Sequence, residues 1–198
     1  MRTELRNSMN EQKKKQLVVL SSPSGGGKST VARHFLKSFP QMSFSVSATT
    51  RLPRPGEIDG MHYFFLSKDE FEQKIKNNEL AEYEEIFGNY YGTLKSEINK
   101  CLTAGRVLLF DVDVKGAVSL RNAYPEDCLL IFISPPSLEI LEQRLRNRKT
   151  ESEEQLSRRL ARAKLEMEYA HEFEYVIIND KLDQMLIEAE MIVRGNIF

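Results

Sequence analysis

The stretch LVVLSSPSGGGKSTVARHF, residues 17–35, contains the residue types that hold a phosphate group. Gly27, Lys28 and Ser29 match the end of the loop pattern Gly-x-x-x-x-Gly-Lys-Ser/Thr, whereas Ser22 stands at the first glycine position. In such a loop, backbone N–H groups at a helix start point at phosphate oxygens, the lysine reaches the β- and γ-phosphates, and the hydroxyl ligates Mg²⁺. The tripeptide alone is common, but an apolar strand before it and an amphipathic helix after it provide the context that the loop requires.

Ser22 is the unusual position of this loop. If the turn out of the strand needs a positive φ, serine costs about 1 kcal/mol there. Serine removes none of the inward-pointing backbone donors, so we expect a functional but slightly strained loop. The alternative is a glycine-rich turn before a surface helix. The residues expected to bind ATP here are Ser22, Pro23, Ser24, Gly25, Gly26, Gly27, Lys28, Ser29 and Thr30.

A second group of residues suits an acceptor phosphate. Arg51 and Arg54 lie three positions apart in a loop rich in proline and glycine. A guanidinium fork binds phosphate oxygens bidentately, and the phenolic hydroxyls of Tyr63 and Tyr91 are further donors. Two arginines in a loop are, by themselves, more often solvated surface.

Asp111 and Asp113 follow an apolar strand expected at residues 107–110. Ligands of open parallel sheets bind at the carboxyl ends of the strands. We expect the two side chains to point to opposite sides and to have different roles. The alternative is a pair of solvated aspartates.

Arginines near residues 144–162 lie in a strongly charged segment, where an arginine is, by sequence alone, more often a solvated surface cation than a group that neutralises a transferring phosphoryl group. Arg144 and Arg148 are four positions apart on one side of an expected helix, and Arg159 lies in the next helix. We interpret three further arginines as surface cations: Arg146, Arg158 and Arg162.

Short apolar strands alternate with helices along the chain, which indicates a parallel sheet with helices on both faces. Capping boxes are expected at Ser67–Glu70 and at Thr150–Glu153. Gly88 and Gly92 are expected to bracket a turn. The expected strands are residues 17–20, 44–46, 63–66, 107–110, 129–133 and 176–178, and the helices begin near residues 29, 67, 94, 138, 150 and 182.

Composition limits the class of protein. The 198 residues suit one α/β domain with small insertions, and 41% of them are hydrophobic. A net charge of −1 gives no general attraction for nucleic acid. Two distant cysteines, no signal peptide and no long apolar run predict a cytoplasmic protein without a membrane partner. Residues 1–15 are expected to form a flexible tail, and the sequence leaves open whether the chain forms a homo-oligomer.

At this point the sequence resembles guanylate kinases. The family pattern Thr-Ser/Thr-Arg-x-x-Lys/Arg-x-x-Glu-x-x-Gly-x-x-Tyr-x-Phe/Tyr is matched by Thr49, Thr50, Arg51, Arg54, Glu57, Gly60, Tyr63 and Phe65. The stretches FGNYYGT at 87–93, DVDVKGA at 111–117 and VIIND at 176–180 are also characteristic. The resemblance covers about residues 16–196, nearly the whole chain.

The resemblance implies an α/β fold and a domain over 16–198 with three parts. They are a P-loop NTPase-type core whose parallel sheet is flanked by helices, a small α+β insert that binds GMP, and a helical lid. It also implies that the γ-phosphoryl group of ATP is transferred to GMP with Mg²⁺, giving ADP and GDP. The implied boundaries are 16–46, 99–135 and 170–198 for the core, 47–98 for the insert and 136–169 for the lid.

The resemblance also implies residue roles. Guanine presents N1–H and N2–H₂ donors that the Glu82 and Asp113 carboxylates can accept, whereas adenine would leave these groups unpaired. Glu57 is interpreted as a support for Arg51 or Arg54. The implied GMP-binding residues are Ser47, Arg51, Arg54, Glu57, Tyr63, Glu82, Tyr91, Gly92, Thr93 and Asp113. Asn179 is placed near the adenine of ATP, and Ser29 and Asp111 hold Mg²⁺, partly through water. The implied catalytic residues are Lys28, Arg51, Asp111, Arg144, Arg148 and Arg159.

Two departures from the family pattern are expected to affect the rate of phosphoryl transfer rather than the type of reaction. Lys149 replaces the glycine of the usual Arg-Gly-x-Glu, and Ala48 stands where serine or histidine is common.

Two other functions remain as alternatives. An inactive, peptide-binding module of this fold would be expected to lose Lys28 and Arg144, which are present. A kinase for another phosphate acceptor would not need the guanine-binding set.

Overall fold

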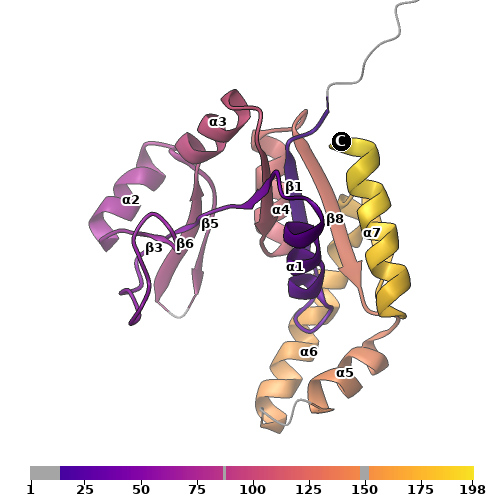
Figure 1. The fold of residues 1–198 in the computed structure, drawn as a ribbon. Helices are drawn as coiled ribbons and strands as arrows, with labels where there is room; N and C mark the ends of the chain where they lie inside the picture. Colours follow the sequence, from indigo (N-terminus) through magenta and orange to yellow (C-terminus); the bar gives the residue numbers. More distant parts are fainter. Residues whose placement is uncertain (1–13, 87, 148–151) are drawn as a thin grey trace, which may run out of the picture.

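A computed structural model describes residues 14–86, 88–147 and 152–198. The predicted tail therefore falls almost entirely outside the described residues, as do Arg148, Lys149 and Thr150. The described chain forms two β-sheets with helices packed against them, and the second sheet lies beside the first rather than continuing it (Figure 1). No helix in the described ranges is long and apolar enough to cross a membrane.

The larger sheet is parallel, which confirms the prediction. Its strand order is β2-β7-β1-β8-β9. All residues of β1 and β8 are buried, because helices cover both faces: α1 and α7 pack on one face, and α3 and α4 on the other. The bounds are β1 Leu17–Ser21, β2 Met42–Phe44, β7 Val107–Asp111, β8 Cys128–Ser134 and β9 Tyr175–Ile178, with α1 Lys28–Ser38, α3 Lys95–Thr103, α4 Val114–Ala123 and α7 Leu182–Asn196.

Strand β2 lies two residues earlier than expected. It pairs with β7 from Met42↔Val107 to Phe44↔Leu109. The pairing stops there because the chain leaves this sheet for the second one, after a last hydrogen bond from Ser45 N–H to the Leu109 carbonyl at 2.9 Å.

The second sheet has the order β4-β3-β6-β5, and α2 packs against it. The turn expected between Gly88 and Gly92 is wrong, because Asn89 onward already pairs with β5, and Tyr90 stacks on Phe71 of α2 with ring centroids 5.2 Å apart. The capping box Ser67–Glu70 at the start of α2 is confirmed. The bounds are β3 Ala48–Thr49, β4 Phe64–Phe65, α2 Lys68–Lys76, β5 Leu80–Ile86 and β6 Asn89–Leu94.

Helices α5 (Leu138–Asn147) and α6 (Glu153–Glu168) pack on each other through a small apolar cluster that includes Leu141, Leu145 and Leu156. The 3₁₀ turn η1 (Tyr169–Glu172) follows α6. The capping box predicted at Thr150 is wrong: Ser152 caps α6, and Gln155 completes the box. Serine is as good a capping residue as threonine, and the helix begins after the later one.

Candidate nucleotide-binding site

The phosphate loop between β1 and α1 has the backbone that its three glycines allow. Gly25 and Gly27 have φ of 91° and 110°, values that favour glycine. Gly26 needs its small size for another reason, since a Cβ there would lie 3.0 Å from the Pro23 carbonyl oxygen and 3.1 Å from that of Ile133. The loop therefore turns tightly over the end of β8 and leads into α1.

The strain expected at Ser22 is wrong. Among the described residues that are not glycine, Asn78 alone has a positive φ. Ser22 is buried, and its hydroxyl donates to the Pro23 carbonyl at 3.1 Å. The left-handed turns fall on Gly25 and Gly27 instead, so serine costs nothing in backbone conformation at this position.

Lys28 and Asp111 meet at the carboxyl ends of neighbouring strands. The register Leu20↔Asp111 brings the end of β7 beside the start of the phosphate loop. Lys28 Nζ lies 2.6 Å from Asp111 Oδ1 and donates to the Val112 carbonyl at 2.8 Å. Lys28 is thus held at the edge of the loop by the end of β7.

Asp111 and Asp113 do face different partners, as expected, but the strand does not cause this. Residues two apart on a strand share a face. Strand β7 ends at Asp111, and Asp113 is the N-cap of α4, where its Oδ1 accepts from Gly116 N–H at 2.8 Å. The change from strand to helix cap separates the two side chains.

Glu82 on β5 comes close to the same helix start. Its Oε1 accepts from the Thr93 hydroxyl at 2.6 Å, and a Cβ on Gly116 would lie 3.2 Å from both Glu82 Oε2 and Asp113 Oδ1. The small size of Gly116 therefore lets the two carboxylates approach one another. Sequence reasoning did not select Gly116, although it belongs to the characteristic stretch at 111–117. The pKa of Glu82 is raised to about 7, mainly by burial and also by the neighbouring carboxylates of Asp113 and Glu84, while the Thr93 hydrogen bond opposes the rise.

Arg51 is held in place by Glu57 and by aromatic rings. Its guanidinium donates to both Glu57 carboxylate oxygens, at 2.9 and 2.8 Å, and lies 5.3 Å from the Tyr63 ring centroid. Glu57 also accepts from Arg54 N–H at 2.6 Å. The hydrogen bond from Arg51 is the main reason why the pKa of Glu57 is lowered to about 2. Arg54 itself is exposed, and the Tyr91 ring lies 6.2 Å from that of Tyr63.

The other residues expected to bind GMP lie on the second sheet. The Ser47 carbonyl accepts from Phe64 N–H at 2.9 Å. A Cβ on Gly92 would lie 2.7 Å from the Glu82 carbonyl oxygen, so Gly92 allows β5 and β6 to pack closely. Because Thr93 pairs with Glu82 across these strands, Gly92 indirectly positions that carboxylate.

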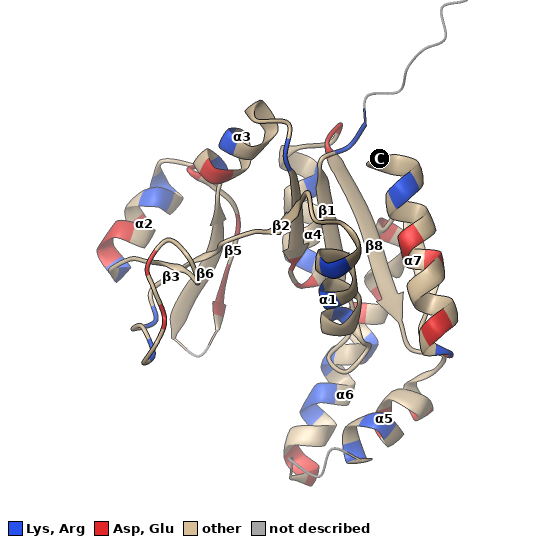
Figure 2. Ribbon diagram, in the orientation of Figure 1, with Lys and Arg blue, Asp and Glu red and all other residues tan. Residues whose placement is uncertain are grey.

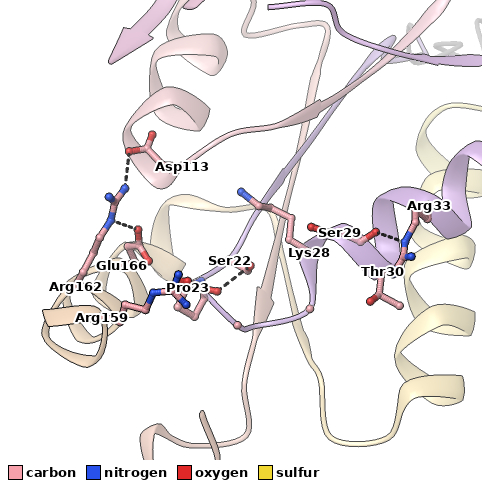
Figure 3. A pocket seen from close by; sticks show the side chains of 13 residues that line it. Ser22, Pro23, Lys28, Ser29, Thr30, Arg33, Asp113, Arg159, Arg162 and Glu166 are labelled. Atoms are coloured by element: carbon pink, nitrogen blue, oxygen red, sulfur yellow. Dashed lines mark hydrogen bonds and ion pairs between the residues drawn. The ribbon is translucent and has the colours of Figure 1, made fainter. Parts of the chain in front are cut away.

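The predicted arginines divide into three groups. Arg159 lies with the phosphate loop around a cavity of about 670 Å³ (Figure 3). Arg144 instead donates to the Asn179 carbonyl at 2.7 Å, and the Asn179 side chain donates to the Gly26 carbonyl at 2.7 Å, so these two residues tie α5 to the loop. Arg148 lies outside the described residues.

The interpretation of Arg162 as a plain surface cation is wrong. It lines the same cavity and lies 3.6 Å from Asp113 and 3.7 Å from Glu84. Asp113 and Glu84 are far from Arg162 in the sequence, so no local sequence pattern predicts these contacts. Arg146 pairs with Glu142 on α5 and with Glu153 on α6, and Arg158 pairs with Glu154 on α6; these exposed ion pairs are expected of surface cations.

The oxygen donors at Ser29 and Asp111 fit Mg²⁺, which prefers a few carboxylate and hydroxyl oxygens together with substrate phosphates and water. No cluster of three or more His, Cys, Asp or Glu side chains that could hold a metal occurs among the described residues.

A parallel sheet, a phosphate loop at the carboxyl end of its first strand and a cavity lined by arginines define a P-loop phosphotransferase. The guanylate kinase family model matches residues 14–195. The chain belongs to the guanylate kinase family and has guanylate kinase function, that of a nucleoside monophosphate kinase.

Individual relatives agree over most of their length. A guanylate kinase of Chlorobium luteolum is 50% identical over 181 residues, covering 91% of this chain and 91% of the relative. One of Rickettsia felis is 48% identical, covering 89% of this chain and 92% of the relative. The crystal structure of guanylate kinase from Anaplasma phagocytophilum matches with a TM-score of 0.68 and 32% identity, over 92% of this chain and 86% of that one. None of these matches favours an inactive binding module.

Proposed function

We propose that this chain transfers the γ-phosphoryl group of ATP to GMP. An oxygen of the GMP phosphate attacks the γ-phosphorus, the bond from that phosphorus to the β–γ bridging oxygen breaks, and ADP and GDP leave. The observation that carries this proposal is the pair of carboxylates, Glu82 and Asp113, at the start of α4, since Asp113 also lines the cavity of the phosphate loop.

On the donor side, the phosphate loop is the proposed cradle for the ATP phosphates. Its N–H groups lie at the start of α1, whose dipole favours negative charge. Lys28, whose Nζ lies 2.6 Å from Asp111 Oδ1, would exchange that carboxylate for the β- and γ-phosphates. Ser29 and Asp111 are the proposed holders of Mg²⁺, which in such sites neutralises phosphate charge.

On the acceptor side, Arg51 is the proposed main contact of the GMP phosphate, together with Arg54, Tyr63 and Tyr91. Support comes from the pairing of Arg51 with Glu57, which holds the guanidinium ready and so reduces the entropy lost on binding. Glu82 and Asp113 would accept from the guanine N1–H and N2–H₂ groups, and Thr93 holds Glu82 in place. Adenine offers no such donors at this edge.

For the transfer step, Arg159 is the proposed cation beside the phosphoryl group, with Arg144 and Arg148 as further lid arginines. Arg159 lines the cavity, and α6 carries it toward the loop (Figure 3). The proposed insert (47–98) and lid (136–169) would close over both substrates and exclude water. The Lys and Arg residues along α5 and α6 suit a lid that closes over negatively charged phosphate groups (Figure 2).

The test is ADP release from ATP and Mg²⁺, with GMP, AMP, CMP and UMP supplied separately. Release with GMP alone is the expected result. Equal release with several monophosphates would overturn the guanine assignment, and no release from folded protein would overturn the proposal as a whole. A cytoplasmic location is part of the proposal, and cell fractionation tests it.

A further inference from the structure

Arg162 joins three separate parts of the molecule. On α6, its Nε donates to Glu166 Oε1 at 2.8 Å. Its Nη2 lies 3.6 Å from Oδ2 of Asp113, the cap of α4, and 3.7 Å from Oε1 of Glu84 on β5 (Figure 3 shows the first of these). One guanidinium therefore lies beside three carboxylates: Glu166 on α6, Asp113 at the start of α4, and Glu84 on the second sheet.

Glu166 fixes the position of Arg162. Only 7% of Glu166 is exposed, and its Oε2 is buried with no hydrogen-bond partner among the described residues. A buried carboxylate needs a cation nearby, because its desolvation is costly. The hydrogen bond to Glu166 is also the main cause of the raised pKa of Arg162. Arg162 is thus charged and anchored, although about half of its side chain is exposed.

Arg162 stands where two cavities meet. Together with Asp113 and Glu166 it lines the cavity of about 670 Å³ that contains the phosphate loop. The same three residues line a smaller cavity of about 170 Å³, which also includes Glu84 and Lys115. The contacts of Arg162 with Asp113 and Glu84 are too long for hydrogen bonds, so they can be remade when a ligand reaches Asp113.

The position of Arg162 on α6 connects it to the phosphate side. Arg159 lies one helical turn earlier, and residues three apart lie on the same side of a helix. Arg159 lines the larger cavity beside the phosphate loop. Because a helix moves largely as a rigid body, a pull on Arg162 toward Asp113 and Glu84 changes where Arg159 stands.

We propose that Arg162 is a positioning residue that couples GMP binding to ATP binding. It would do so by drawing α6 toward Asp113 and Glu84 and so placing Arg159 at the phosphate loop. The inference rests on the proposed function, since it takes Asp113 as a contact of guanine. It goes further by assigning the communication between the two substrate sites to one side chain, which lines the phosphate-loop cavity and lies beside Asp113.

The experiment measures the dissociation constant of GMP without and with a saturating, non-hydrolysable ATP analogue. The ratio of the two constants is the coupling factor, and it is reciprocal between the ligands. We expect a factor of roughly five or more for the wild type and about one for Arg162→Met, which keeps the apolar stem but loses the charge. The matched control is Arg158→Met. Arg158 pairs with Glu154 on the same helix, so its replacement should leave the coupling factor unchanged.

A second variant separates coupling from folding. Glu84→Gln leaves the Arg162–Glu166 pair in place and removes one contact between α6 and the second sheet. It should lower the coupling factor, and adding it to Arg162→Met should lower it no further, since both changes break one interaction. Arg162→Lys should give an intermediate factor because a single ammonium cannot replace the fork.

Two results would overturn the inference. One is a wild-type coupling factor in Arg162→Met, and the other is a factor of one in the wild type itself. Neither would touch the proposed function, provided that the wild type still releases ADP with GMP. Loss of that release in the wild type would count against the proposed function instead.

Discussion

Glu82→Gln is an almost isosteric change that tests how the purine is recognised. The amide oxygen can still accept from the Thr93 hydroxyl, now 2.6 Å from Glu82 Oε1. The other oxygen becomes an NH₂ group, which would face a donor of guanine. Losing one hydrogen bond to a charged acceptor and leaving a donor unpaired costs about 3 kcal/mol. We therefore expect kcat/KM for GMP to fall roughly 100-fold, with KM for ATP changed less than about twofold.

The pH dependence gives a second, independent measure of the same group. The ionised carboxylate is the form that accepts from guanine, and the pKa of Glu82 is raised to about 7, first by burial. In the wild type, kcat/KM for GMP should fall about tenfold per pH unit below that value. In the variant it should stay flat through the same range. Identical profiles in the two proteins would refute the assignment, as would equal loss of GMP and ATP affinity in titrations.

Stability supplies the third measure, with a definite sign. The folded pKa of about 7 lies above the ordinary value of 4.5, so between these pH values the folded state binds more protons than the unfolded state. The free energy of unfolding of the wild type should therefore fall as pH rises from 4.5 to 7, by at most about 3 kcal/mol. Glu82→Gln should lack this decline and be the more stable protein at pH 8. Urea unfolding at pH 5 and pH 8 measures it.

Three further predictions concern the cradle, the helix start and the arginine support. Lys28→Ala should lower phosphoryl transfer by roughly 1000-fold or more with an unchanged circular dichroism spectrum, and near-normal turnover would refute the cradle. Gly116→Ala places a methyl group 3.2 Å from the Glu82 and Asp113 carboxylates, so KM for GMP should rise about tenfold while KM for ATP stays constant; equal changes in both would count against it. Glu57→Gln should raise KM for GMP. The pKa of Glu57 is lowered from 4.5 to about 2, so the ionised carboxylate stabilises the folded state above pH 4.5, and this contribution is lost as the pH falls toward 2. The free energies of unfolding of wild type and variant should therefore converge as the pH is lowered.

Much of this protein follows from short stretches of sequence. The phosphate loop, the capping box at Ser67 and the apolar strands depend on neighbours within a few residues, so their patterns predict them. Local patterns failed where a nearby competitor decided the outcome. Ser152 replaced Thr150 as the cap of α6, and pairing with β5 turned the expected turn after Gly88 into a strand.

The arrangement of the site depends on contacts between distant segments. The register of β1 and β7, together with the turn of the phosphate loop, brings Lys28 to Asp111. The packing of β5 beside α4 makes Gly116 the residue whose small size admits Glu82. The sequence contains each of these side chains and indicates their chemistry. Which ones meet is decided by tertiary packing. Arg162 shows this, because Glu166 is its neighbour on the same helix, whereas Asp113 and Glu84 come near it only through the surfaces that the fold brings together.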